Sequence, residues 1–260
     1  MDLILELKAR NEILFYFGFA NLVAAVLFLI LSFSNPLEAV GTNAWHKPIK
    51  FALSTLILSW SLAWYVGYLD ASSDLNVANW IIVVTLGFEV VYIALQASRG
   101  ELSHYNESTP FHAAMFSSMA LAATIATLTI GYIGLKFYAT SFPNLPDSYV
   151  WAIRLGIVLF VIFSFEGFVM GANSGHTVGA KDGGAGIPFL NWSVTHGDLR
   201  IAHFVGMHAL QVLPLLALLV LRDLRLTIVA AVVYGLLAIF VFVQATRGRP
   251  FLQSFEREES

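Results

Sequence analysis

Long apolar stretches separated by short polar segments dominate the pattern of this chain. A window of about 19 residues finds runs long enough to cross roughly 30 Å of hydrocarbon. They predict seven transmembrane helices, near residues 12–33, 48–69, 77–97, 111–137, 149–171, 199–221 and 226–246. We therefore expect an all-α, polytopic integral membrane bundle that forms a single transmembrane domain over residues 1–260.

The first apolar run is interpreted as a retained helix. Lys8 and Arg10 precede it, as in a signal peptide, but the run is long and ends in Ser32-Phe33-Ser34-Asn35-Pro36 without a small-x-small cleavage pattern. An odd number of crossings places the two ends of the chain on opposite sides of the membrane. We call the N-terminal side of the membrane side A and the opposite side side B.

Composition supports the membrane assignment and excludes several functions. Apolar residues make up 58% of the chain and charged residues 12%, against roughly 45–50% and about 25% in soluble domains. The net charge of -3 without a basic block argues against a nucleic-acid partner. Cysteine is absent, so thiolate metal ligands and disulfides are excluded.

The loops differ in chemistry between the two sides. Side A carries short connectors, whereas side B carries residues 43–48, residues 99–106 and a long glycine-rich loop over residues 172–198. A loop longer than about 12–15 residues is usually functional or disordered, and we expect this one to be a mobile lid. All seven histidines fall in the side B loops or the side B halves of helices, namely His46, His104, His112, His176, His196, His203 and His208.

Two glutamates interrupt predicted transmembrane helices. Glu89 lies in the third run and Glu166 in the fifth. A charge at the centre of the bilayer costs about 2.5–3.5 kcal/mol on insertion scales, so such residues are functional candidates. We predict that Glu89 and Glu166 are catalytic. At about 100° per residue, Glu89 and Gln96 share one face of the third helix, as Arg200 and His203 do in the sixth.

Imidazole and carboxylate groups together are typical ligands of transition metals. We predict that Fe, Zn, Mn or Cu, or a haem, binds in a cavity near side B, with ligands among His203, His208, His112, His196 and His46. No His-x-x-x-His or His-Glu-x-x-His motif is present, so the ligands would come from different helices. The alternative is that these groups hydrogen-bond one another and hold the bundle together. Taken singly, His46, His104 and His176 are better explained as ordinary loop residues.

A short internal match suggests two related halves. Gln96-Ala97-Ser98-Arg99-Gly100 ends the third helix and Gln244-Ala245-Thr246-Arg247-Gly248 ends the seventh, while His46 and Lys50 correspond to His196 and Arg200. The pattern favours two parallel three-helix repeats joined by the fourth helix, an arrangement found in transporters. The seventh helix has no lysine for a retinal Schiff base, which argues against a light-driven pump.

Basic and amide side chains are expected to surround the side B mouth. We predict that they bind an anionic headgroup or a substrate carboxylate, and the set comprises Arg99, Arg247, Gln96, Gln244, Lys50 and Arg200. Taken singly, Arg99 and Arg247 are explained by snorkelling from helix ends. Eight Lys and Arg residues on side B against six on side A favour a cytoplasmic C-terminus.

Two functional hypotheses follow. The first is a metal- or haem-dependent membrane enzyme, an oxidoreductase or a hydrolase, that acts on a lipid-soluble or amphiphilic substrate near side B. The alternative is a proton-coupled small-solute transporter in which Glu89 and Glu166 carry the protons. Beyond the lipid bilayer and such a small molecule, the sequence indicates no partner and no oligomeric state.

Overall fold

The computed structural model describes residues 2–251. Within them lie seven helical segments long and apolar enough to cross a membrane, which confirms the all-α seven-helix bundle. The spans are α2 (Glu12–Ser34), α3 (His46–Val66), α4 (Ser73–Ala97), α5 (Pro110–Ala139), α6 (Asp147–Phe165) with α7 (Gly167–Ala172), α8 (Leu199–Leu216) with the π-helical turn Ala217–Leu221, and α9 (Leu224–Thr246).

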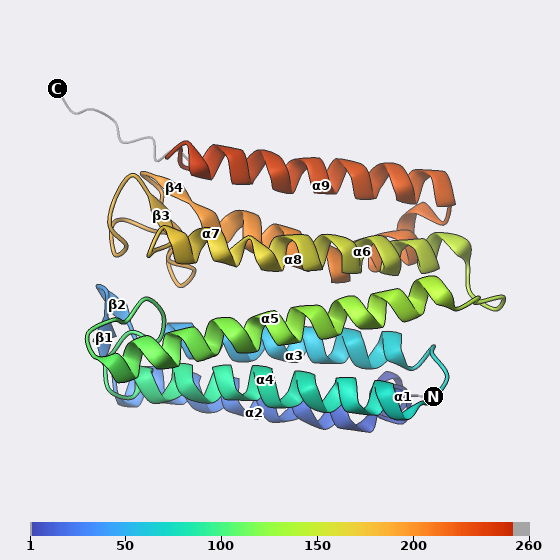
Figure 1. Cartoon of the computed structure of the whole chain (residues 1–260), viewed down its shortest axis with the longest axis horizontal. Coiled ribbons are helices and arrows are strands. Elements are labelled where there is room, and N and C mark those ends of the chain that lie inside the picture. The colour runs from blue at the N-terminus through green and yellow to red at the C-terminus, as the bar shows by residue number, and fades with distance from the viewer. Residues whose placement is uncertain (1, 252–260) are drawn as a thin grey trace.

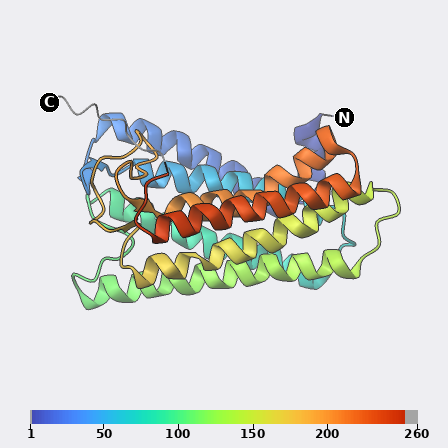
Figure 2. The same ribbon diagram turned by 90° about the horizontal axis from the view of Figure 1, so that it is seen from above.

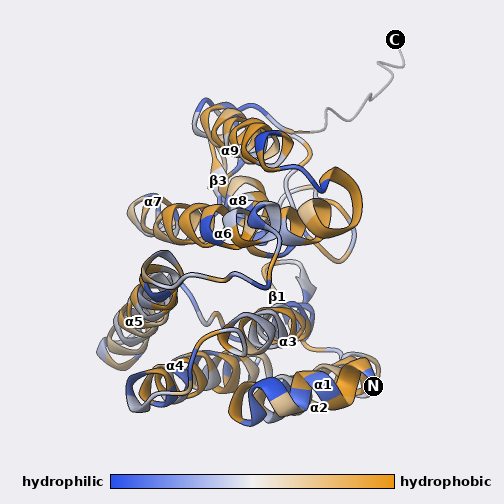
Figure 3. Ribbon diagram, turned by 90° about the vertical axis from the view of Figure 1, so that its right-hand side faces the viewer, coloured by the Kyte–Doolittle hydropathy of each residue, from blue (hydrophilic) through white to orange (hydrophobic). Residues whose placement is uncertain are grey.

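The helices form two units (Figures 1 and 3). The N-terminal unit comprises α2, α3 and α4, in which α2 packs mainly on α3; the C-terminal unit comprises α6 to α9, in which α6 packs mainly on α8. Helix α5 lies between the units and contacts α4 and α6. Many large apolar side chains along the spans are exposed, as expected for helices that face lipid. The ribbon coloured by hydropathy is largely hydrophobic along these helices (Figure 3).

Helix ends are specified by local side chains. Asn11 accepts a hydrogen bond from the backbone of Leu14 and caps α2, and Thr109 accepts one from His112 and caps α5, whose first residue is Pro110. These caps fix the first residues of α2 and α5. Helices α3, α5 and α8 all begin on side B, where the long loop also lies (Figures 1 and 2).

A two-stranded antiparallel pair precedes the second helix of each unit on side B. In the N-terminal unit β1 (Glu38–Ala39) pairs with β2 (Thr42–Asn43); in the C-terminal unit β3 (Thr177–Val178) pairs with β4 (Gly197–Asp198). Gly100 after α4 and Gly248 after α9 both have left-handed backbones, with φ of 70° or just below, and lie against the first strand of their own unit. The internal repeat itself stays a prediction.

Three features were not anticipated from the hydrophobic pattern. A short helix, α1 (Leu3–Arg10), precedes the first span, and its Arg10 guanidinium lies 4.1 Å from the centroid of the Trp64 ring. The fifth span breaks at Glu166, between α6 and α7. The sixth span widens into a π-helical turn just after Pro214, which has no backbone N–H for the regular helical hydrogen bond.

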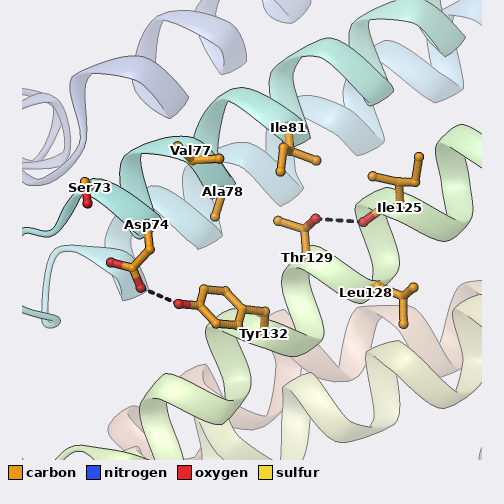
Figure 4. Close-up of a pocket in the computed structure, with 9 residues that line it drawn as sticks. All are labelled: Ser73, Asp74, Val77, Ala78, Ile81, Ile125, Leu128, Thr129 and Tyr132. Carbon is orange, nitrogen blue, oxygen red and sulfur yellow. Dashed lines mark hydrogen bonds between the residues drawn. The ribbon is translucent and has the colours of Figure 1, made fainter.

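A hollow of about 550 Å³ lies between α4 and α5 on side A (Figure 4). Its walls are apolar, and the one carboxylate on its rim, Asp74, pairs with the Lys136 ammonium at 2.5 Å and accepts a hydrogen bond from Tyr132. Because this rim is already neutralised, the hollow offers no reactive group. The side chains that form the candidate site lie at the side B ends of the helices.

Close packing of α6 on α8 depends on glycine, as is common between membrane helices. A Cβ atom at position 206 would lie 1.9 Å from Cγ of the Phe163 ring, whereas a Cβ at Gly171 would meet no atom within 4 Å. We predict that Gly206→Ala lowers the melting temperature of the detergent-solubilised protein, since overpacking typically costs about 1–3 kcal/mol. Gly171→Ala is the matched control and should leave it unchanged. Equal melting temperatures for the two variants would contradict the packing.

Candidate functional site

Polar side chains from both units and from the loops converge at side B. We call this set the side B cluster, and it comprises Lys47 at the start of α3, Glu89 in α4, His104 and Tyr105 in the loop before α5, and His176 and Asp182 in the long loop before α8. The charges of Asp182 and Glu89 act on the Lys47 ammonium, and that ammonium acts on both histidines.

A chain of ring contacts connects the N-terminal unit to the long loop. The ring centroid of Phe51 lies 5.8 Å from that of His104, and the Tyr105 ring lies 5.1 Å from that of His176. Tyr105 has a left-handed backbone with φ of 56°, which is uncommon for a bulky residue. Strained residues of this kind often occur at functional sites, and here the conformation turns the Tyr105 ring towards His176.

His176 and Asp182 form the most closely defined part of the cluster. Nδ1 of His176 lies 2.6 Å from Oδ2 of Asp182, whose carboxylate also accepts hydrogen bonds from the backbone N–H groups of His176 and Thr177. Burial works to raise the pKa of Asp182, but the hydrogen bonds from His176 and Thr177 outweigh it and hold that pKa well below its usual range.

Burial also lowers the pKa of His176, although its hydrogen bond to Asp182 opposes the shift. At neutral pH the pair is therefore a neutral imidazole beside an ionised carboxylate. An ionised carboxylate only accepts hydrogen bonds, so Nδ1 of His176 must carry the proton. This leaves the lone pair of Nε2 available to accept a proton, as in the histidine of a catalytic triad.

The neighbouring groups complete the electrostatics of the cluster. Burial, with the charge of Lys47, lowers the pKa of His104 well below its ordinary value, and Nδ1 of His104 lies 3.1 Å from the Ser103 hydroxyl. Burial raises the pKa of Tyr105. At neutral pH the cluster thus contains two neutral imidazoles and one neutral phenol.

Two of the cations predicted to bind substrate hold the long loop in place. The Lys50 ammonium donates hydrogen bonds of 3.0 Å to the carbonyls of Phe189 and Leu190. The Arg200 guanidinium donates to the buried carboxylate of Asp198 and to the carbonyl of Asn191. Their polar groups are therefore engaged with the protein itself, and their role in substrate binding stays a prediction.

Lys47 differs from these two cations. In residues 2–251 its ammonium has no hydrogen bond and no ion pair, and it lies 5.9 Å from the centroid of the Phe51 ring. The sequence analysis did not single it out.

The two glutamates predicted to be catalytic are both buried. Glu166 is 7% exposed, and Nδ1 of His203 lies 3.3 Å from its Oε2. That nitrogen lies closer, at 2.7 Å, to the carbonyl oxygen of Phe163, which accepts the hydrogen bond from Nδ1 of His203. Both oxygens of Glu166 consequently lack a hydrogen bond within the described chain. Glu89 is 8% exposed, and the charge that acts on it is that of Lys47. The catalytic role of both stays a prediction.

The five predicted metal ligands have separate surroundings. His203 lies beside Glu166, and the others pair or pack elsewhere: His46 on Phe189, His112 with Glu101, His196 with Thr195 and His208 on Phe204. In the part of the chain that the structure describes, no group of three or more His, Asp or Glu side chains is arranged to hold a metal ion. A metal or haem centre stays a prediction from the sequence.

The remaining predicted binding residues lie at the side B ends of α4 and α9. Gln96 is buried and donates to the Tyr92 hydroxyl at 2.7 Å, and Gln244 donates to the carbonyl of Pro250 at 2.6 Å. Arg99 and Arg247 are exposed. Their positions fit the alternative interpretation, in which arginines at helix ends extend to the membrane interface.

Sequence reasoning did not select the residues that the structure brings together. The sequence favours ordinary loop roles for His104 and His176, and it gives Asp182 no role beyond its place in the glycine-rich loop. One signal was available, since all three belong to side B loops that are rich in polar side chains. The pairing of His176 with Asp182, six residues later, depends on the path of the loop, which spacing alone does not reveal.

The lowered pKa values predict a pH dependence of stability. An unfolded histidine titrates near pH 6.5, so His104 and His176 bind protons more readily in the unfolded chain. Their contribution to stability is complete above that pH and is lost as the pH falls towards their folded pKa values, by at most about 1.4 kcal/mol per pH unit for each group. Asp182 does not contribute in this range, because its stabilising effect is lost only in stronger acid.

We therefore expect the melting temperature of the detergent-solubilised protein to fall between pH 7.5 and pH 5.5. In His104→Gln that fall should be smaller, since one of the two groups is removed. The measurement compares the fall within each protein, so a general loss of stability in the variant does not affect it. If the melting temperature of His104→Gln falls by as much as that of the unaltered protein, the lowered pKa of His104 is contradicted.

Known proteins do not indicate what this site does. No family model, no curated protein and no solved structure matches the chain. The function is therefore inferred from the chemistry of the side B cluster.

Proposed function

We propose that the protein is a membrane-embedded enzyme that performs acid–base chemistry on an amphiphilic substrate at side B. The observation that carries the proposal is the His176–Asp182 pair, held at 2.6 Å within a cluster to which both helical units contribute. We also propose that side B faces the cytoplasm, which the excess of Lys and Arg on that side favours.

His176 is proposed to be the proton acceptor. Its Nε2 takes a proton from the substrate, and Asp182 stabilises the imidazolium that forms. The low pKa of Asp182 keeps this carboxylate ionised throughout the physiological range. A general base whose own pKa lies below neutrality is present in its reactive form at pH 7.

Tyr105 is proposed to stabilise the negative charge that develops on the substrate. Its phenol is neutral at pH 7 because burial raises its pKa, and its ring contacts that of His176. A neutral hydroxyl donates a hydrogen bond to an oxyanion, and a fixed donor of this kind commonly contributes more than any other single effect to catalysis.

An amphiphilic substrate suits the position of the cluster. The polar groups lie where helices begin at the membrane face, whereas the outer surfaces of both units are apolar. A molecule whose polar group reaches His176 therefore has hydrocarbon immediately beside it.

This proposal is tested by following the molecules that the protein consumes. Purified protein in liposomes is incubated with a total lipid extract, and the extract is analysed by mass spectrometry over time. We expect at least one amphiphilic species to be converted, and His176→Gln to lower its rate of conversion by about 100-fold or more, because general acid–base catalysis contributes 10²–10⁴-fold. Asp182→Asn should lower the rate as well.

The matched control is His112→Gln, which changes a histidine that pairs with Glu101 outside the cluster. It should convert the same species at the rate of the unaltered protein. If no species is consumed, or if His176→Gln consumes the same species at the same rate, the proposal is wrong.

A second candidate function is a proton-coupled small-solute transporter. One observation favours it, namely that the buried carboxylate of Glu166 has no hydrogen bond within residues 2–251. Carboxylates inside membrane spans often mark proton or ion pathways in pumps and transporters. In this case a pH gradient across liposomes should drive solute uptake, and both Glu166→Gln and Glu89→Gln should abolish its dependence on pH. Liposomes that show no uptake under a gradient would exclude this role.

A further inference from the structure

Three cationic side chains lie at the side B ends of α3 and α8. Lys50 and Arg200 are already engaged, the first by two backbone carbonyls and the second by the carboxylate of Asp198. The carbonyls that hold Lys50 carry no net charge, so its positive charge still acts on Lys47, as does that of Arg200. Lys47 alone of the three has no partner in the described chain.

Within residues 2–251, no carboxylate near Lys47 is in direct contact with its ammonium. Asp182 is occupied by His176 and by the backbone of Thr177. Glu89 interacts electrostatically with Lys47, but within residues 2–251 no carboxylate lies within 4 Å of its ammonium. The ring of Phe51 limits the access of water on one side. Lys47 is half-buried, and an ammonium without a counter-anion in such a setting is costly, so an incoming anion would lower that cost.

The backbone adds to the same positive potential. Helix α3 begins at His46 and α8 begins at Leu199, so the N-terminal ends of both helices point to side B. The first N–H groups of a helix together carry a partial positive charge that favours anions. Lys47 therefore lies where the charges of Lys50 and Arg200 and the ends of two helices act together.

We propose that Lys47 binds the anionic headgroup, a phosphate or a carboxylate, of the amphiphilic substrate, whose hydrocarbon chain stays in the bilayer. This rests on the proposed enzyme function for the identity of the ligand as a substrate. It also explains the geometry of the cluster. The charge of Lys47 acts on both His176 and His104, so a headgroup bound to Lys47 would belong to the same cluster as the proposed base.

The test measures binding to the full-length protein in a neutral detergent, through the shift in melting temperature on titration. The probes are dodecyl phosphate, laurate, inorganic phosphate and uncharged dodecanol. We expect the two anionic amphiphiles to bind and dodecanol to bind far more weakly. Stabilisation by inorganic phosphate equal to that by dodecyl phosphate would show that the site takes a free anion instead. Equal binding of dodecanol would overturn the proposal.

Variants of Lys47 separate its role from a general effect of charge. Lys47→Gln should weaken binding of dodecyl phosphate by about tenfold or more, the effect expected for the loss of a charged hydrogen bond. Lys47→Arg keeps the charge and should restore most of the binding. Lys181→Gln removes an exposed lysine from the long loop and should bind as the unaltered protein does. Unchanged binding in Lys47→Gln would overturn the proposal.

A measurement on the unaltered protein covers the case in which Lys47→Gln does not fold. Lysines are acetylated with and without dodecyl phosphate, and the modified peptides are quantified by mass spectrometry. Dodecyl phosphate should protect Lys47 and leave Lys181 unprotected. If saturating amphiphile leaves the labelling of Lys47 unchanged, the proposal is wrong.

Binding of an anionic amphiphile at Lys47 does not depend on the proposed catalytic role of His176. His176→Gln should bind dodecyl phosphate as the unaltered protein does while losing conversion of substrate. Binding that persists without any conversion would contradict the enzyme function and leave the anion site in place. Conversion of an uncharged substrate, without binding of either anionic amphiphile, would contradict the anion site alone.

Discussion

The side B cluster depends on the buried carboxylate of Asp198. Its side chain is 1% exposed and accepts hydrogen bonds from the backbone of Ser193 and from the backbone and guanidinium of Arg200. These bonds hold the end of the long loop onto the start of α8, and Lys50 binds the same loop from the other unit. With its end fixed, the loop can place His176 against Tyr105. Removal of the Asp198 carboxylate would leave the Arg200 charge without its partner in a largely buried setting, a change that is typically costly.

Charged groups without a partner are more costly in or beside a membrane than they are in water. In water a free carboxylate or ammonium is satisfied by solvent, but within or beside hydrocarbon it needs a partner from the protein. Most polar groups of the bundle find one locally, as when the hydroxyls of Ser59 and Thr85 donate to carbonyls one turn earlier in their own helices. Glu166 and Lys47 are exceptions in the described chain. The proposals of an anion site at Lys47 and of a transport role for Glu166 both start from this lack of a partner.

Much of the fold follows from the sequence, whereas little of the site does. Runs of apolar residues specify each span independently, so the all-α bundle was predictable without knowledge of how the helices pack. The burial of Glu89 was predictable in the same way, because it interrupts an apolar run. The partners of His112 and Arg200 were not, since Glu101 and Asp198 lie in loops whose paths depend on tertiary contacts. The concentration of histidines on side B predicts which face carries the candidate site. The proposal of His176 rather than His203 as the functional histidine depends on the loop conformation.

The site arises from a difference between two otherwise comparable units. Each unit has a β pair before its second helix and ends in a left-handed glycine that lies against the first strand. In the N-terminal unit Val40 and Gly41 join the strands, whereas in the C-terminal unit residues 179–196 intervene and carry Asp182. The N-terminal unit in turn supplies Lys47 and, through the loop after α4, Tyr105. Neither unit contains the cluster by itself. The side B cluster therefore depends on the packing of the two units across α5, because a shift between them would separate His176 from Tyr105 without altering either unit internally.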